Sequence, residues 1–374
     1  MKNIIHVISM RRGLGGVQQS FLSYYKYAQK NSRYKQYIFS NHEISKNYGY
    51  LKNFLKIQKN FFSFLKHLVS KNSIIYLHNK LSSKKIFYLL KLMPSNNNII
   101  FAESGVAWNM KTQQQIEIYQ KNADLAKKII VCSIATKHML VKRFKLDEKK
   151  IVLIYNGQED PKIKKKNTNK KNINIGFIGR LESIKGAHLF IEAAILLKQY
   201  NFNFLIAGDG HLEKELKELS KANKNIKFIG NVKNPFNFIK SLDILVVPSI
   251  REPLGLVSIE AGLCKVAVIA SNIDGIPEVI TNKHSGILLN PTQKINSKKY
   301  NSKMSLPDFV INPSNHKLIK PRQLDPKKLS NSILLLSKNK KLRFNYGFKL
   351  YQHVKERFSI KSYFNSIEEL YGEF

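Results

Sequence analysis

Residues 244–260 read ILVVPSIREPLGLVSIE, and this stretch decides the fold. Ile244–Val247 is a continuous apolar run, which is typical of a buried parallel strand. A short loop follows, and a helix is expected from Gly255 onward. The start of a helix carries unpaired backbone N–H groups and the positive end of the helix dipole. The amides of Gly255, Leu256 and Val257 can therefore hold an anionic group such as a phosphate.

Two glutamates flank the start of this helix. Glu252 lies in the loop and Glu260 lies about one and a half turns into the helix. One carboxylate can therefore face the loop while the other projects from the helix, so that both contact different parts of one extended ligand. Taken alone, the pair also fits a surface loop followed by a solvated helical residue.

The same alternation of apolar runs and amphipathic stretches continues along the whole chain. The pattern predicts strands at 4–8, 37–40, 74–77, 98–102, 129–131 and 151–155, and again at 173–178, 202–207, 226–229, 244–247, 266–270 and 286–289. Helices are expected at 187–199, 212–221, 255–263, 277–280 and in the tail at 330–374. Strands that alternate with helices predict an α/β fold with parallel sheets.

The chain of 374 residues is longer than the roughly 250–300 residues that one hydrophobic core usually serves, so two domains are expected. A Lys/Asn-rich tract at 164–172 predicts the linker, which gives domains at 1–165 and 166–350. Residues 291–325 are polar and aperiodic and form either an ordered excursion or a disordered insertion. We expect residues 351–374 to be helices that cross back to the N-terminal domain.

The net charge of +38 is the strongest signal in the composition. It has three explanations that the sequence leaves open: attraction to an anionic membrane or acceptor, non-specific contact with nucleic acid, or a biased genome. No recognised DNA- or RNA-binding module is visible, so no specific nucleic-acid partner is expected. No apolar stretch approaches the ~20 residues needed to cross a bilayer, which predicts a soluble or peripheral protein.

The two cysteines, Cys132 and Cys264, lie in apolar stretches without neighbouring metal-ligand motifs. They predict neither a disulfide framework nor a zinc site, and the expected location is the cytoplasm. The glycines after the first strand (Gly13, Gly15 and Gly16) lack the spacing of a dinucleotide-binding loop, so NAD is not expected.

The first strand of the second half runs into a loop that contains Gly179, Arg180 and Lys185. Cations beside glycines at the carboxyl end of a strand are suited to clamp a diphosphate. Gly208 and Asp209 follow the next strand, and Val232 follows the one after it. Open α/β sheets place their ligand-binding loops at these ends, although ordinary turns also fit the glycines.

In this order the motifs resemble glycosyltransferase family four, whose members are retaining enzymes with the GT-B architecture of two Rossmann-like domains facing across a cleft. The resemblance covers nearly the whole chain. The matching segments are Gly15-Gly16, Tyr155-Asn156-Gly157, Gly179-Arg180-Leu181 with Lys185-Gly186, Ala207-Gly208-Asp209-Gly210, Arg251 to Gly255, Glu260-Ala261, and Ala270 to Glu278.

The resemblance implies roles for these residues. Arg180 and Lys185 would bind the donor diphosphate and stabilise the leaving group, Glu252 would contact the donor sugar, Glu260 would hold the ribose, and Val232 would adjoin the base. Fixed cations and helix amides can stabilise a departing diphosphate without a metal. A nucleotide-diphosphate sugar is thus the expected co-substrate, and neither a metal nor another cofactor is expected.

The acceptor side departs from the family. A Glu-His-Gly-like sequence is common there, whereas this chain reads Glu103-Ser104-Gly105. A serine replaces neither the base nor the cation that an imidazole offers, so Glu103 remains the candidate in that loop, together with Gly15 and Gly16 after the first strand. His78 is expected at the rim of the cleft.

Residues 50–71 combine apolar and basic side chains. They predict either a helix lying on an anionic membrane or a core-facing helix with a solvated basic face. We therefore expect transfer of a sugar to a glycan acceptor, such as a lipid-linked envelope glycan of the lipopolysaccharide-core type. The alternative is a non-catalytic, membrane-associated subunit that binds nucleotide sugars.

Overall fold

The computed structural model describes residues 2–9, 15–39, 57–58, 70, 72–91, 98–161, 172–295 and 306–374. The chain divides into two compact units: unit 1 is residues 1–159 with 359–374, and unit 2 is residues 160–358. The sequence had predicted the corresponding domain boundaries between residues 165 and 166 and between residues 350 and 351. Of the expected linker, only Asn172 lies within the described residues.

Unit 1 contains a parallel sheet in the order β3-β2-β1-β4-β5-β6-β7. Its strands are β1 (Asn3–Val7), β2 (Lys35–Phe39), β3 (Ile57–Gln58), β4 (Ser73–His78), β5 (Asn98–Glu103), β6 (Lys128–Val131) and β7 (Ile151–Leu153). The six strands predicted in this half are confirmed, and the short β3 was not predicted. Strand β4 is buried at every position, as expected for a parallel strand covered on both faces.

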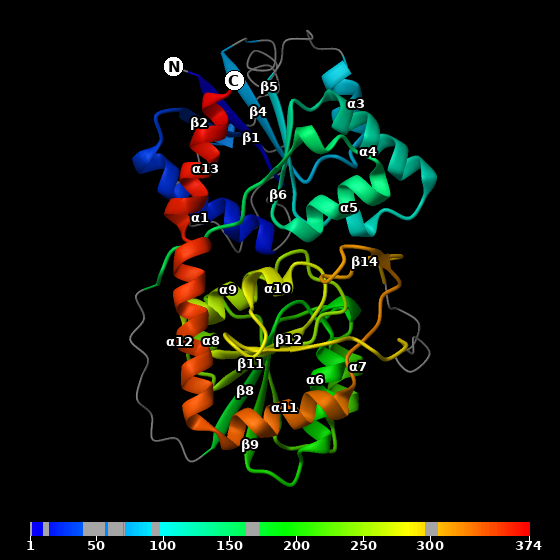
Figure 1. Ribbon diagram of the computed structural model, residues 1–374, viewed down its shortest axis with the longest axis vertical. Helices are drawn as coiled ribbons and strands as arrows, with labels where there is room; N and C mark the ends of the chain where they lie inside the picture. Colours follow the sequence, from blue (N-terminus) through cyan, green and yellow to red (C-terminus); the bar gives the residue numbers. More distant parts are fainter. Residues whose placement is uncertain are drawn as a thin grey trace. The chain divides into compact units, whose positions relative to one another are not determined.

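The helices of unit 1 include the last one of the chain. In the described residues they are α1 (Gly16–Asn31), α3 (Lys84–Lys91), α4 (Gln113–Leu125), α5 (Ile134–Phe144) and α13 (Ile360–Gly372), with two short 3-10 helices, η2 (Ala107–Asn109) and η3 (Glu148–Lys150). Figure 1 shows α13 in red beside α1 in blue. Ile367, Leu370 and Tyr371 of α13 join the core formed by α1 and the strands. The chain end belongs to unit 1 because this apolar face is buried there.

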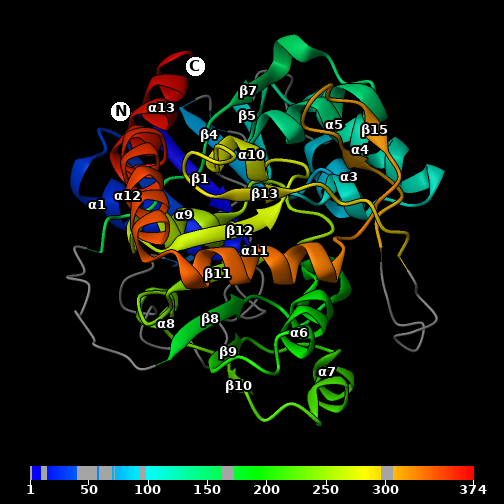
Figure 2. The same cartoon turned by 60° about the horizontal axis from the view of Figure 1, so that its bottom comes forward.

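Unit 2 contains a second parallel sheet, in the order β10-β9-β8-β11-β12-β13, of which Figure 2 shows the first five strands one after another. The strands are β8 (Ile173–Ile178), β9 (Phe202–Ala207), β10 (Ile226–Gly230), β11 (Ile244–Val247), β12 (Ala267–Ser271) and β13 (Ile287–Leu289). All six predicted strands are confirmed to within one residue. Strand order reverses direction between β8 and β11, and ligands of open α/β sheets bind at such a switch point.

The helices of unit 2 pack on this sheet and on one another. They are α6 (Ala187–Leu196), α7 (Glu213–Ser220), α8 (Pro235–Ile239), α9 (Leu256–Leu263), α10 (Ile276–Val279), α11 (Pro326–Lys338) and α12 (Lys340–Arg357). Helix α11 packs against α6, and α12 packs against α9 and β12. The tail that the sequence predicted as helical is therefore three helices, two in unit 2 and one in unit 1.

The described part of the 291–325 segment is an ordered excursion. It contains an antiparallel pair, β14 (Val310–Ile311) with β15 (Leu318–Ile319). Val310 and Ile311 are fully buried, so the pair is anchored by apolar contacts that the polar composition of the segment did not indicate. Residues 296–305 lie outside the described residues.

Candidate functional site

The loops that follow β8 and β11 meet at the switch point of the unit 2 sheet. The backbone N–H of Ile250 donates to the Ile184 carbonyl at 2.8 Å. Gly186 has a φ of +72°, and a Cβ at this position would lie 2.1 Å from the Pro248 carbonyl oxygen. Only glycine fits this backbone and this close approach, so the Lys185-Gly186 motif has a structural reason.

Lys185 and Glu252 form an ion pair in these two loops. The Nζ atom of Lys185 lies 2.6 Å from Oε2 of Glu252, and the two side chains are 22% and 13% exposed. The Ser249 hydroxyl donates to the same carboxylate oxygen at 3.2 Å. The structure thus brings together two residues that the sequence selected, 67 positions apart. Sequence reasoning gave no role to Ser249.

Asp274 fixes the backbone of Glu252. Its Oδ2 atom accepts from the Glu252 N–H at 2.9 Å, and its Oδ1 atom accepts from the Ile311 N–H at 2.7 Å. Asp274 is 2% exposed and has a φ of 45°, a conformation that Asp tolerates better than most residues. The carboxylate therefore joins the β14–β15 segment to the loop of Glu252. The sequence contained Asp274 within a matching motif but gave no sign of these partners.

Helix α9 begins beside this ion pair. Gly255 caps it with a φ of 94°, and the N–H groups of Ser258 and Ile259 donate to the Gly255 carbonyl. Within the described residues, the N–H groups of Gly255, Leu256 and Val257 have no hydrogen-bond partner. They are free to bind an anion, and the helix dipole favours negative charge at this end.

Glu260 lies inside the same helix and is 3% exposed. No hydrogen bond to its carboxyl group comes from the described part of the chain. Burial raises the pKa of Glu260 from 4.5 to about 8. The group is thus a carboxyl whose hydrogen-bonding capacity is available to a ligand such as a ribose.

The other predicted donor residues lie on neighbouring strand ends. Arg180 is exposed, and its Nη1 atom lies 2.6 Å from Oε1 of Glu182. The Gly179 N–H donates to the Ala207 carbonyl, and the backbone of Gly208 lies against Gly179.

The loop after β10 lies beside the loop after β9. The side-chain amide of Asn231 donates to Asp209 at 3.3 Å, which joins the loop of Asp209 to the loop that holds Val232. Val232 itself is half-buried. The carboxyl ends of β8, β9 and β10 thus carry all five predicted residues on one edge of the sheet.

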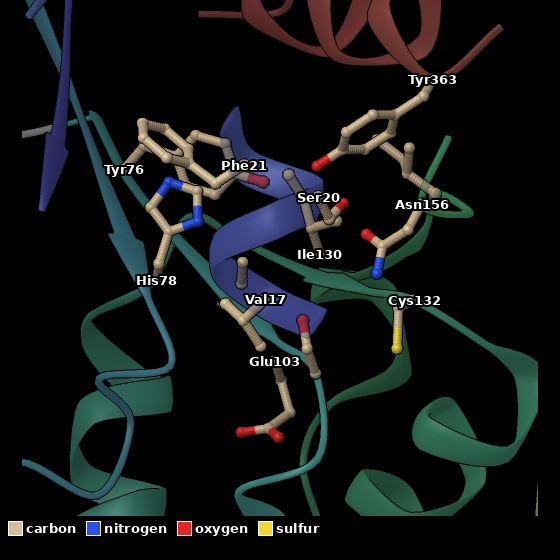
Figure 3. A pocket seen from close by; sticks show the side chains of 13 residues that line it. Val17, Ser20, Phe21, Tyr76, His78, Glu103, Ile130, Cys132, Asn156 and Tyr363 are labelled. Atoms are coloured by element: carbon tan, nitrogen blue, oxygen red, sulfur yellow. The ribbon is translucent and has the colours of Figure 1, made fainter. Parts of the chain in front are cut away.

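Unit 1 contains a small pocket at the carboxyl ends of β4 and β5, which Figure 3 shows from close by. It offers a volume of ≈ 20 Å³, room for about one water molecule or one hydroxyl group. Polar side chains line it together with apolar ones. The polar lining residues that Figure 3 labels are Ser20, Tyr76, His78, Glu103, Asn156 and Tyr363.

Glu103 is 1% exposed and is held by its own loop. Its Oε1 atom accepts from the N–H groups of Gly105 at 2.6 Å and Ala107 at 3.2 Å, and also from Val106. Its Oε2 atom accepts from the Tyr119 hydroxyl at 2.7 Å. Burial raises the pKa of Glu103, and these hydrogen bonds oppose the shift. Both oxygens are thus engaged in fixing the loop, while contact with an acceptor stays a prediction.

The remaining acceptor-side predictions are at the start of α1. Gly15 is the residue before the helix, and Gly16 is its first residue. The expected basic helix at 50–71 lies outside the described residues except for β3 and residue 70, so both interpretations of it stay predictions. The sequence placed His78 at a rim, whereas it lines the pocket and is 8% exposed.

Among the described residues, no group of three or more His, Cys, Asp and Glu side chains is arranged to hold a metal ion. None of the described helices is both long and apolar enough to cross a membrane.

Sequence comparison identifies one family match and several relatives. Residues 158–305 match the family model described as glycosyl transferases group 1. The capsular polysaccharide biosynthesis glycosyltransferase CapM of Staphylococcus aureus is 32% identical over 124 residues, which cover 32% of this chain and 33% of that relative's length. The uncharacterized glycosyltransferase MJ1178 of Methanocaldococcus jannaschii is 27% identical over 76% of this chain and 79% of its own.

Solved structures resemble the chain along its full length. The Anabaena protein Alr3699/HepE in complex with UDP-glucose covers 100% of both chains with a TM-score of 0.76 at 16% identity. The lipopolysaccharide outer core galactosyltransferase WaaB covers 100% of both chains with a TM-score of 0.66 at 15% identity. At these identities the likeness shows the fold, GT-B. Residues 158–305 thus resemble the group 1 glycosyl transferases, and the chain as a whole has the GT-B fold.

Proposed function

We propose that the chain transfers a sugar from a nucleotide-diphosphate sugar to a glycan acceptor, with retention at the anomeric carbon and without a metal ion. One observation carries the proposal: the Lys185–Glu252 ion pair lies at the switch point beside the open N-terminus of α9. A cation, a carboxylate and unpaired amides are the groups that a diphosphate and a sugar require.

The ion pair suggests how the donor would bind. The diphosphate would take Lys185 away from Glu252, because two phosphates offer more negative charge than one carboxylate. Glu252 would then be free to accept hydrogen bonds from sugar hydroxyl groups. Lys185, Arg180 and the α9 amides would stabilise the charge that develops on the departing diphosphate.

The acceptor is proposed to be a lipid-linked envelope glycan of the lipopolysaccharide-core type. Relatives with capsular polysaccharide and O-antigen names support this class, since CapM and the Escherichia coli O-antigen biosynthesis glycosyltransferase WclY are 32% and 33% identical over their matched stretches. The positive net charge of +38 also favours an anionic surface or acceptor.

The test measures nucleoside-diphosphate release from a panel of nucleotide sugars in the presence of extracted glycolipids. Lys185→Ala and Glu252→Ala are each expected to lower kcat/KM about 100-fold or more, since each loses a charge used in the transition state. Lys198→Ala, on an exposed turn of unit 2, is the matched control and should turn over normally. Normal turnover of Lys185→Ala would remove that residue from the mechanism.

Two finer points need their own measurements. Retention is checked by NMR of the product, whose anomeric configuration should equal that of the donor. Metal independence is checked with EDTA, which should leave the rate unchanged. An inverted product or a rate lost to EDTA contradicts the corresponding part of the proposal.

A second candidate function is a non-catalytic subunit that binds nucleotide sugars. The observation that favours it is Ser104, which lines the unit 1 pocket where family members often carry a histidine. Calorimetry with the same nucleotide sugars separates the two functions. Donor binding without release of diphosphate in any acceptor mixture would favour the subunit.

A further inference from the structure

His78 is the one imidazole among the residues that line the unit 1 pocket. Its Nε2 atom lies 3.1 Å from Nδ1 of His6, a residue of β1 with no exposed surface. The ring therefore has one nitrogen, Nδ1, left for the pocket, and the described residues offer no hydrogen-bond partner for it. Figure 3 shows one ring nitrogen of His78 turned toward the side of the pocket where Val17 and Ser20 lie.

The proton position on His78 can be traced from Glu368 on α13. Ser32 donates to Oε1 of Glu368 at 2.7 Å, while Oε2 accepts from the Arg33 N–H. A carboxylate only accepts hydrogen bonds, so the single Ser32 proton is committed to it. The Ser32 oxygen must then accept from its remaining neighbours, the Tyr34 N–H at 3.0 Å and the Gln36 side-chain amide at 3.1 Å.

The orientation of the Gln36 side-chain amide determines which ring nitrogens of His6 and His78 carry a proton. Its Nε2 atom donates to Ser32 and to the Tyr24 hydroxyl, so its Oε1 atom faces Nε2 of His6 at 3.1 Å. His6 must therefore carry its proton on Nε2 and leave Nδ1 unprotonated. Nδ1 of His6 then accepts from the Nε2–H of His78, which leaves Nδ1 of His78 with a free lone pair.

Both rings are neutral near pH 7. Burial lowers the pKa of His6 to about 4. Burial, followed by the charges of His6 and Lys80, lowers the pKa of His78 well below its ordinary value. A ring with so low a proton affinity is a hydrogen-bond acceptor and a poor general base.

We propose that Nδ1 of His78 accepts a hydrogen bond from a hydroxyl group of the acceptor glycan, in the tautomer that the chain Glu368–Ser32–Gln36–His6 imposes. The ligand class, a sugar hydroxyl, rests on the proposed function. The pocket volume of ≈ 20 Å³ fits one such group in place of one water. His78 thus acts by positioning the acceptor.

The first test reads the tautomers without any substrate. The full chain is labelled with ¹⁵N-histidine, and long-range ¹H–¹⁵N spectra distinguish protonated from unprotonated ring nitrogens. His6→Asn and His78→Asn identify the two signals among the ten histidines. We expect Nε2–H tautomers for both rings at about pH 7. A proton on Nδ1 of His78 would overturn the proposal, whether or not the chain transfers sugar.

The second test asks what the lone pair binds. The probes are methyl glycosides of several hexoses, and the control is the fully O-methylated form of each, which keeps the ring but has no hydroxyl donor. We expect at least one glycoside to move the ¹⁵Nδ1 signal of His78 saturably, and no methylated form to do so. A shift with both forms, or with none of the glycosides, overturns the assignment of a hydroxyl.

The third test applies to the turnover assay. In His78→Asn, the Oδ1 atom replaces Nδ1 as the acceptor in the pocket, whereas His78→Gln keeps the donor toward His6 and loses the acceptor. We expect His78→Gln to raise the acceptor KM about tenfold, His78→Asn to stay within about threefold of the wild type, and kcat and donor affinity to change little in either. Equal losses in both variants, or a fall in kcat alone, would contradict the positioning role.

Discussion

Glu260 carries a carboxyl group that is buried inside helix α9. Its carboxyl group is 3% exposed, and the described residues do not compensate its burial by hydrogen bonds. Such a group is costly to ionise in the free protein, which is why its pKa rises to about 8. The proposed contact with a ribose would supply hydrogen bonds to this group.

The raised pKa predicts how stability depends on pH. Between about pH 4.5 and about pH 8 the unfolded chain has released the proton that folded Glu260 keeps, so the free energy of unfolding should fall as pH rises through this window. Glu260→Gln should remove this part of the decline. Thermal unfolding of both proteins across the window measures it, and parallel Tm curves would contradict a raised pKa.

Gly186 predicts a second effect at the scale of one residue. Gly186→Ala should destabilise the chain by about 3 kcal/mol or more, because it adds a clash with the Pro248 carbonyl to a left-handed backbone. Gly230→Ala is the matched control: its φ is +73°, but a Cβ there would meet nothing within 4 Å. It should cost only about 1 kcal/mol. If urea unfolding gives the same loss in the free energy of unfolding for both variants, the contact with the Pro248 carbonyl does not destabilise Gly186→Ala.

At the scale of elements, the β14–β15 segment and α13 each form hydrogen bonds that fix residues in other parts of the chain. Their own sequences did not predict these contacts. The first is tied to Glu252 through Asp274, which accepts from the Ile311 N–H on one side and the Glu252 N–H on the other. The second supplies Glu368, whose carboxylate fixes the direction of the hydrogen bonds that end at His78. In both cases an element distant in sequence determines the geometry of a site residue.

Helix α13 also predicts a measurable contribution to unit 1. Ile367 is fully buried in the core that α13 shares with α1, so Ile367→Ala should lower the free energy of unfolding by about 2–5 kcal/mol. Glu369→Ala, one of the exposed positions of the same helix, should change it by less than about 0.5 kcal/mol. If the two variants unfold at the same denaturant concentration, α13 does not contribute to the core as described.

For the whole molecule, the net charge of +38 raises the question of whether the protein binds anionic surfaces. If the charge serves attraction to an anionic membrane, the protein should co-sediment with phosphatidylglycerol vesicles, should not co-sediment with phosphatidylcholine vesicles, and should be released at about 0.5 M salt, where screening is strong. Absence of binding at low salt would leave the composition of the genome as the better explanation. Equal binding to RNA would indicate a non-specific polycation.

The fold followed from the sequence with few errors, for physical reasons. Strands buried on both faces must be apolar throughout, so runs such as Ile244–Val247 are visible in one dimension. The loops that contain Lys185, Gly186 and Glu252 were visible too, because they follow such strands, where parallel sheets place their ligand loops. Short elements such as β3 and β14 were missed, since two residues carry no periodicity.

The sequence by itself thus determined the two parallel sheets, the loops at their carboxyl ends and the residue types in those loops. Only the tertiary structure decided which partners those residues have: Lys185 with Glu252, and Asp274 with Ile311. It also decided the tautomer of His78. Patterns of apolar residues report burial and direction along one element, whereas a hydrogen bond joins two atoms whose separation in the chain follows no rule.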